Sequence, residues 1–112
     1  MTTSATQREI RDRYAAGERN FAHIHLAGED LSYADLRGVN LQGANLRGCD
    51  LSFADLEASD LTGADLRGCL LFSTNLRGAT LDGALFTRAD FDSYTRFPEG
   101  FDPTAHDMTQ DA

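Results

Sequence analysis

The chain has 112 residues, of which 41% are hydrophobic and 25% charged, and a formal net charge of −8 at pH 7. This length is typical of one domain, and the negative charge argues against general binding of nucleic acids or anionic membranes, which needs clustered positive charge. Because no apolar run approaches a membrane span and the N-terminus lacks a signal-peptide pattern, we expect a cytoplasmic protein with its two cysteines reduced.

The first predicted element is a short helix over residues 4–17. Ser4 followed by Gln7 is typical of a capping box, and the final glycine is typical of a helix end. Ile10 and Tyr14, four residues apart, give the helix one apolar edge. We expect the first twenty residues to form a capping helix and lead-in that closes one end of the domain.

A five-residue repeat follows, over residues 21–95. Every fifth residue is Leu or Phe, and we call it the centre of its repeat; the centres are Phe21, Leu26, Leu31, Leu36, Leu41, Leu46, Leu51, Leu56, Leu61, Leu66, Leu71, Leu76, Leu81, Phe86 and Phe91. The residue two before a centre is usually small, and the residue before it is usually Asp or Asn. Eight of the ten glycines stand two places after a centre.

A period of five suits neither standard element. On an α-helix, five residues rotate a side chain by roughly 500°, so that successive leucines would spiral around the helix. On a flat strand, an odd step turns each leucine to the opposite face. All centres share one interior only when the chain turns a corner in each repeat, and glycine permits the positive φ that such a turn needs.

The segments at residues 34–38, 44–48 and 64–68 read Ala-Asp-Leu-Arg-Gly, Ala-Asn-Leu-Arg-Gly and Ala-Asp-Leu-Arg-Gly. They resemble the signature of the pentapeptide-repeat family. The resemblance implies an all-β fold, the right-handed quadrilateral β-helix, with twenty residues per coil. The repeats would then make just under four coils, about 18 Å tall at the strand spacing.

Residues 96–112 are predicted to be a capping tail. Arg96 stands where a further centre is due. The segment around it resembles the tail that follows the repeats in many cyanobacterial members, where it lies across the last coil. Phe97 and Phe101 would be its anchors, and after Pro103 we expect a polar, disordered end.

Three aromatic residues are the best candidates for a contact surface. Tyr33 and Phe53 stand one coil apart where glycine is usual, and Phe72 is expected to project from the same face one coil higher. Stacked aromatic side chains on a polar solenoid indicate a contact surface for a protein partner or a second copy. The alternative is that they only stack and seal the edge. Arg37 and Arg77 on the neighbouring face are weaker candidates.

The regular aspartates offer a second hypothesis. Rows of carboxylates on a rod can imitate DNA phosphates, and some family members resemble DNA in this way and bind DNA gyrase. Interspersed arginines such as Arg47 and Arg67 interrupt the negative charge here, and a rod of about 18 Å covers only about five base-pair steps. Aspartate and asparagine are also simply favoured beside turns.

A thiol redox or metal-binding protein is the third hypothesis. Cys49 and Cys69 fall in one inward column, one coil apart, with Glu29 a coil below. Two thiols and one carboxylate fall short of four metal ligands, and cysteine also serves as a small buried apolar residue. Alternation places His23 and His25 on opposite sides, and no third ligand accompanies them. Packing is the expected role of the two cysteines, and packing or solvent contact that of the two histidines.

No arrangement of nucleophile, base and orienting residue is evident, and a rod filled with leucine offers no substrate cleft. We therefore expect a protein that is not an enzyme and that needs no cofactor or metal. Its predicted role is that of an interaction or scaffold module, which presents rigid faces to an unidentified protein partner and binds neither nucleic acid nor membrane directly. The sequence leaves open whether it is a monomer or a homodimer.

Overall fold

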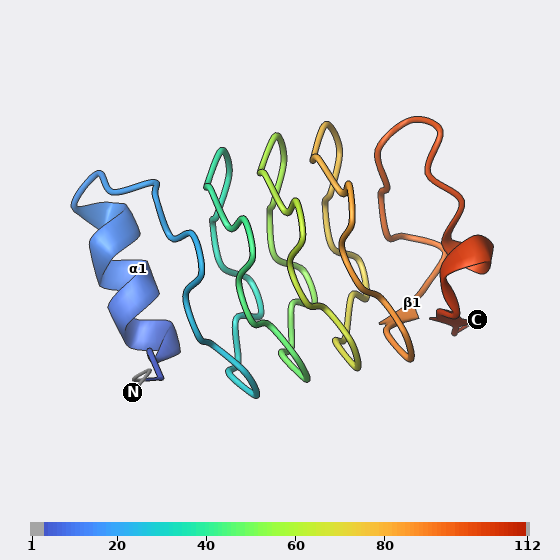
Figure 1. Ribbon diagram of the computed structural model, residues 1–112, viewed down its shortest axis with the longest axis horizontal. Helices are drawn as coiled ribbons and strands as arrows, with labels where there is room; N and C mark the ends of the chain where they lie inside the picture. The colour runs from blue at the N-terminus through green and yellow to red at the C-terminus, as the bar shows by residue number, and fades with distance from the viewer. Residues whose placement is uncertain (1–3, 112) are drawn as a thin grey trace.

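The computed structural model describes residues 4–111, which form a row of stacked coils with a helix at one end (Figure 1). Helix α1 spans Gln7–Ala15. Its N-cap is Thr6, whose side-chain oxygen accepts a hydrogen bond from the backbone N–H of Glu9 at 3.2 Å. The predicted capping box that begins at Ser4 is therefore wrong, because Thr6 has the extended backbone and the acceptor of an N-cap.

Helix α1 lies beside the first coil at one end of the stack (Figure 1). Its apolar edge, Ile10 and Tyr14, packs with the core. Ile10 is completely buried, and the Tyr14 hydroxyl donates a hydrogen bond to the Arg37 carbonyl at 2.9 Å. The helix ends at its C-cap Ala16, and Gly17 follows with a φ of 100°. Over residues 4–111, no helix has the length and apolar character of a membrane span.

Parallel bridges join each coil to the next. They start in turn at Asn20, His25, Asp30 and Asp35, and every bridge up to the one between Leu70 and Asp90 pairs a residue with the one twenty positions later. Each coil therefore has four sides. Between two sides the backbone turns a corner; Gly38, for example, has a φ of 71°, and the Val39 N–H closes the turn on the Leu36 carbonyl at 3.3 Å.

The centres line the interior of the coils. Fourteen of the fifteen are buried, and so are most of the small residues two places before them. Leu81 is only partly buried, because it borders a hollow of about 390 Å³ between the last coil and residues 98–101. Burial of each leucine stabilises the fold by about 1.5–3 kcal/mol before the entropy of ordering is counted.

The chain takes one extra residue at the corner after Phe91. Asn75 bridges to Arg96, twenty-one residues later, instead of to the residue twenty later. The interpretation of Arg96 as a residue in a centre's place is therefore wrong. Phe97 follows the bridge as a centre follows in other repeats, and its ring contacts that of Phe91 edge-on, with 5.4 Å between centroids.

The tail continues over the end of the last coil. Phe101 lies between Phe97 and Phe86, with centroid distances of 5.1 and 5.4 Å, and both Phe97 and Phe101 pack against the core. The 3-10 helix η1 spans Pro103–His106, and strand β2, Thr109–Gln110, pairs in parallel with strand β1, Asp90–Phe91.

The expectation of a disordered end after residue 103 is thus wrong for the described residues. The His106 ring stacks on Phe101 at 4.5 Å between centroids, and β2 continues the parallel bridging of the last coil. The aromatic contacts and the backbone pairing both depend on tertiary structure, so the polar composition of this segment gave no indication of them.

The Asp and Asn residues before the centres have a structural role. Their side-chain oxygens accept a hydrogen bond from the backbone N–H two residues later, at 2.9–3.3 Å, in ten repeats. The ten are Asn20, Asp30, Asp35, Asn40, Asn45, Asp50, Asp55, Asp60, Asp65 and Asn75. Such side-chain turns favour these residue types at corners.

These turns predict that the fold is sensitive to acid. Hydrogen bonding to the Arg37 side chain, followed by the Arg37 backbone N–H and charge, lowers the pKa of Asp35 to about 2. Hydrogen bonds from Thr62 and Arg67 likewise hold the pKa values of Asp60 and Asp65 below 3.8. A depressed native pKa stabilises the fold above the unfolded value, and this stability is lost as the pH falls through the native value.

We therefore expect the urea midpoint to be constant from about pH 7 to 5 and to fall steadily between about pH 4 and 2. Circular dichroism during urea titrations at several pH values measures this. A midpoint that stayed level down to about pH 2 would show that the turn carboxylates do not contribute to stability.

Candidate functional site

An aromatic pair forms the most conspicuous feature of the solenoid surface. The rings of Tyr33 and Phe53 stack one coil apart, with 4.9 Å between centroids and 3° between planes. Tyr33 is 71% exposed and Phe53 53% exposed. We call these two residues the aromatic corner. Both rings thus keep one face or edge in solvent, where a partner can contact them.

The turn itself does not require aromatic residues at these positions. Tyr33 and Phe53 both have a φ of 62°, in the left-handed region where glycine is free of strain. A residue with a side chain is destabilised there by roughly 1–2 kcal/mol. Ring stacking offsets about 0.5–1.5 kcal/mol of this. The aromatic corner therefore adds little or nothing to the stability of the fold.

Phe72 does not belong to the stack. It is half-buried, and no ring pair among the described residues joins it to Phe53. The next corner up is Ser73, with a φ of 53°, and Phe72 instead accepts the Phe53 N–H at its carbonyl oxygen, 2.9 Å away. Phe72 thus lies one coil above Phe53, directly before the corner at Ser73.

The two predicted arginines differ in their surroundings. Arg37 donates two hydrogen bonds of 2.8 Å to the Asp35 carboxylate, and its Nε lies 3.9 Å from a carboxylate oxygen of Asp55. In residues 4–111, Arg77 makes no side-chain ion pair or hydrogen bond. Arg37 is thus held in place within the chain, whereas the Arg77 guanidinium is available to a partner.

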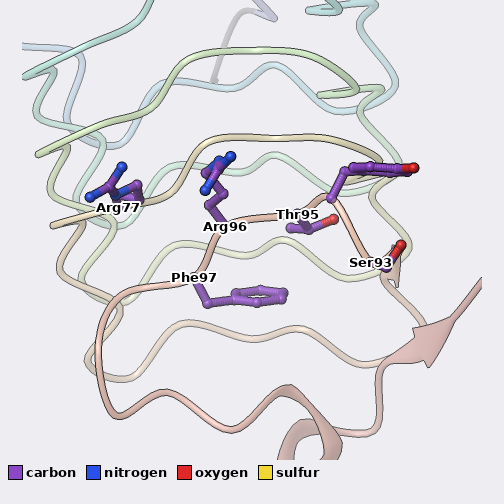
Figure 2. Close-up of a pocket in the computed structure, with 6 residues that line it drawn as sticks. Arg77, Ser93, Thr95, Arg96 and Phe97 are labelled. Atoms are coloured by element: carbon purple, nitrogen blue, oxygen red, sulfur yellow. The ribbon is translucent and has the colours of Figure 1, made fainter.

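Arg77 borders an open hollow of about 470 Å³ together with Ser93, Tyr94, Thr95, Arg96 and Phe97. Figure 2 shows the side chains of Arg77 and Arg96 next to each other, with the Phe97 ring turned away from them. Tyr94 is 74% exposed. Tyr94 and Arg96 were not among the residues predicted for the site, because a five-residue register that continues past Phe91 places both side chains in the interior.

The extra residue explains the exposure of Tyr94. Thr95, not Tyr94, takes the inward slot, and its hydroxyl donates to the Leu71 carbonyl at 2.6 Å. Thr74 makes the equivalent bond to the Leu51 carbonyl one coil earlier, at 2.7 Å. In the sequence, the threonine that follows Tyr94 was the available signal for this shift in register, because a threonine, Thr74, also fills the inward position one coil earlier.

Cys49 and Cys69 are buried free thiols in the inward column. Each donates a hydrogen bond from Sγ to a carbonyl of the coil below, Leu26 and Leu46, at 2.8 Å. Burial is the main cause that raises the pKa of Cys49 to about 11 and that of Cys69 further. The thiols thus occupy the same position as the Thr74 hydroxyl, and their surroundings disfavour the reactive thiolate.

Both thiols are therefore expected to be unreactive in the native protein. A thiol pKa raised from 9.0 to about 11 lowers the thiolate fraction at pH 8 by roughly 100-fold, in addition to the steric protection of burial. With a colorimetric disulfide reagent, we expect no reaction in minutes without denaturant and two equivalents at once in guanidinium chloride. Rapid native labelling would favour the redox hypothesis.

The two histidines of the first repeat lie apart from any ligand cluster. His23 is exposed and His25 is half-buried, with its carbonyl accepting the Ala5 N–H at 2.7 Å. Within residues 4–111, no group of three or more His, Cys, Asp or Glu side chains is arranged to hold a metal ion.

Similarity to known proteins identifies the fold. The family model described as pentapeptide repeats matches in eight copies, over residues 20–52 and 49–88. The crystal structure of alr5209, a pentapeptide repeat protein from Nostoc PCC 7120, is 42% identical, with a TM-score of 0.65; the match covers 99% of this chain and 100% of that one.

Two further solved structures are similar over part of the chain. HetL, a pentapeptide repeat protein involved in heterocyst differentiation regulation in Nostoc sp. strain PCC 7120, is 38% identical over 62% of this chain and 37% of its own, with a TM-score of 0.36. Rfr23, a pentapeptide repeat protein from Cyanothece 51142, is 25% identical over 70% and 63%, with a TM-score of 0.35. No curated protein matches the chain.

The repeat matches extend over more than half of the 112 residues, and the alignment with alr5209 runs nearly end to end. The chain thus belongs to the pentapeptide-repeat family, whose members fold as right-handed quadrilateral β-helices and act in general as non-enzymatic structural or interaction modules.

Proposed function

We propose that this protein is a non-enzymatic interaction module of the cytoplasm that presents the aromatic corner to a protein partner. Its rigid part would be a β-helix of just under four coils over residues 21–95. Residues 1–20 would form the cap at one end and residues 96–112 the cap at the other, of which residues 1–3 and 112 lie outside the described part of the chain. Phe72, Arg37 and the hollow beside Arg77 would flank the contact.

One observation carries this proposal: two aromatic residues occupy left-handed corners where glycine would be free of strain, and both are exposed. Five other side-chain-bearing residues among the described ones, Arg88 included, share the left-handed conformation, so the stacked and exposed aromatic rings, not the backbone alone, distinguish this pair. Exposed aromatic rings are also the side chains that contribute most to protein interfaces. The buried thiols and the turn-bound carboxylates offer no comparable surface.

The test is the double variant Tyr33→Gly, Phe53→Gly. Because loss of the stacking offsets relief of the backbone strain, we expect its free energy of unfolding to stay within about 1 kcal/mol of the wild type. Proteins that the wild type captures from a lysate of the source organism should be absent from the variant's capture, as identified by mass spectrometry.

Arg88→Gly is the matched control, because Arg88 is also an exposed residue in the left-handed region, with a φ of 64°. This control should retain every captured protein. A double variant that folds and keeps the full set of captured proteins would refute the aromatic corner as the contact surface.

The DNA-mimic hypothesis remains as an alternative that a gyrase supercoiling assay addresses directly. The regular carboxylates of the chain accept hydrogen bonds from backbone N–H groups of their own turns, and Arg67 neutralises Asp65 at 2.7 Å. Both features weaken the likeness to a row of phosphates. Inhibition or protection of gyrase by this protein would favour the alternative over the proposal made here.

A further inference from the structure

Charge is segregated along one side of the solenoid. This side contains the centres Leu36, Leu56 and Leu76, and we call it the polar face; its outward residues are Asp35, Arg37, Asp55, Glu57, Asn75, Arg77 and Arg96. We call the part of each coil that lies on the polar face a rung, and we number the rungs from helix α1. The first two rungs carry three carboxylates and one arginine, a net charge of −2. The two rungs nearer to the C-terminus carry two arginines and no acid, a net charge of +2.

Three charged side chains of the polar face have no ion-pair partner among the described residues, whereas the charges of the coil nearest to helix α1 neutralise each other. Among the described residues, neither Arg77 nor Arg96 forms a side-chain ion pair, and Glu57 has none either. Asp35 and Arg37 neutralise each other at 2.8 Å. The open hollow beside Arg77 and Arg96 leaves both guanidinium groups accessible (Figure 2).

We propose that two copies of this chain pair through their polar faces, antiparallel, about a two-fold axis that runs across the face. This rests on the proposed function, since it names a second copy as the partner. Reversal about such an axis places the second rung of one copy opposite the third rung of the other. Glu57 then lies opposite the Arg77 position of the second copy, and Asp35 opposite the Arg96 position.

The same arrangement also brings aromatic residues together. The aromatic corner and Tyr94 lie along one edge of the polar face, the aromatic corner near helix α1 and Tyr94 beside the C-terminal hollow. An axis across the face keeps this edge opposite itself but exchanges its ends. Tyr33 of one copy therefore meets Tyr94 of the other, and each contact occurs twice, as in any two-fold interface.

A parallel arrangement would place each coil opposite its equivalent. Glu57 would then face the acidic rung that contains Asp55, and Arg77 and Arg96 would lie together with their counterparts. Like charges in close opposition disfavour a complex. Charge complementarity therefore favours the antiparallel arrangement.

The interface is small. Three rung spacings span about 14 Å, and with a width of at most 26 Å the face covers no more than about 360 Å² per chain. A standard interface buries roughly 800 Å² per partner. The dimer is therefore weak and depends on salt, with monomers at low micromolar concentration and pairing as the concentration rises.

An ion pair between Glu57 and Arg77 of the same chain is the competing explanation for these charges, because Glu57 lies one coil below Arg77. The experiment must therefore distinguish contacts between chains from contacts within one chain.

The test uses two single variants, Glu57→Arg and Arg77→Glu. In a dimer of either variant alone, the exchanged residue faces a like charge twice. In a mixture of the two variants, the arginine introduced at position 57 of one chain faces the glutamate introduced at position 77 of the other. The unaltered Arg77 and Glu57 also pair in this mixture.

We expect sedimentation equilibrium, from about 10 µM to 1 mM, to show wild-type dimers in low salt that dissociate at about 0.5 M NaCl. Each variant alone should remain monomeric, with at least a tenfold weaker association, and the equimolar mixture should recover dimers. Only pairing between chains produces this recovery, because a contact within one chain does not change on mixing.

Arg88→Glu, on a different side of the solenoid, is the control for net charge and should dimerise as the wild type does. A wild type that stays monomeric to 1 mM, or a mixture that stays monomeric while the wild type dimerises, would overturn the inference. Neither result bears on capture of a different protein by the aromatic corner, which the double glycine variant tests separately.

Discussion

Leu56→Ala is expected to lower the free energy of unfolding by about 2–5 kcal/mol. Leu56 is fully buried near the middle of the stack, with a coil on each side. Removal of its isopropyl group leaves a cavity that the neighbouring backbone cannot close, since hydrogen bonds fix the spacing of the coils. Urea denaturation followed by circular dichroism measures the difference.

Thr87→Ala serves as its control, because Thr87 is exposed, and it should change stability by no more than about 0.5 kcal/mol. A loss below about 1 kcal/mol for Leu56→Ala would mean that the coils can collapse into the space. The rigid, closely packed interior described above would then be wrong.

The second large effect is expected at Asp92. One carboxylate oxygen of Asp92 accepts bonds from the backbone N–H groups of Ser73, Tyr94 and Thr95, all at 3.0–3.1 Å. Lower corners of this column, such as Phe53, bond to a backbone carbonyl of the next coil instead. Asp92 therefore replaces a main-chain acceptor where the extra residue interrupts the pattern.

We expect Asp92→Ala to destabilise the protein by about 1–3 kcal/mol, because several N–H groups lose one shared acceptor. Asp92→Asn keeps an acceptor oxygen in place and should lower the free energy of unfolding by less than half of the amount expected for Asp92→Ala. Asp82→Ala is the control at an exposed aspartate. Thermal unfolding of the three variants ranks them, and equal melting temperatures for all three would exclude the proposed role of Asp92.

The burial of the centres and the turns at Asp and Asn could be read from the sequence, because both depend on features repeated in every five residues. Each centre needs only a corner in its own repeat, and each turn aspartate binds an N–H two residues away. Repetition made the pattern unambiguous, and the family assignment is confirmed by the repeat matches.

The ends of the solenoid were harder to predict. The helix was predicted to begin at Ser4 although Thr6 caps it, since both residues are good N-caps and only contacts with the first coil choose between them. The extra residue after Phe91 was missed for a similar reason. A shift of one residue changes which side chain points inward, and the stability of either register depends on contacts with Leu71 and Phe91, distant in the sequence.

The sequence by itself determined the period, the common interior and the columns of the coils, including the vertical alignment of Tyr33 with Phe53. Only the tertiary structure decided which exposed charges within residues 4–111 are paired and which have no ion-pair partner there, such as Arg37 with Asp35 as against Arg77 and Arg96. The physical reason is that the fold imposes inward positions through burial in every repeat, whereas outward side chains choose among several neighbours on adjacent coils, a choice that local sequence does not constrain.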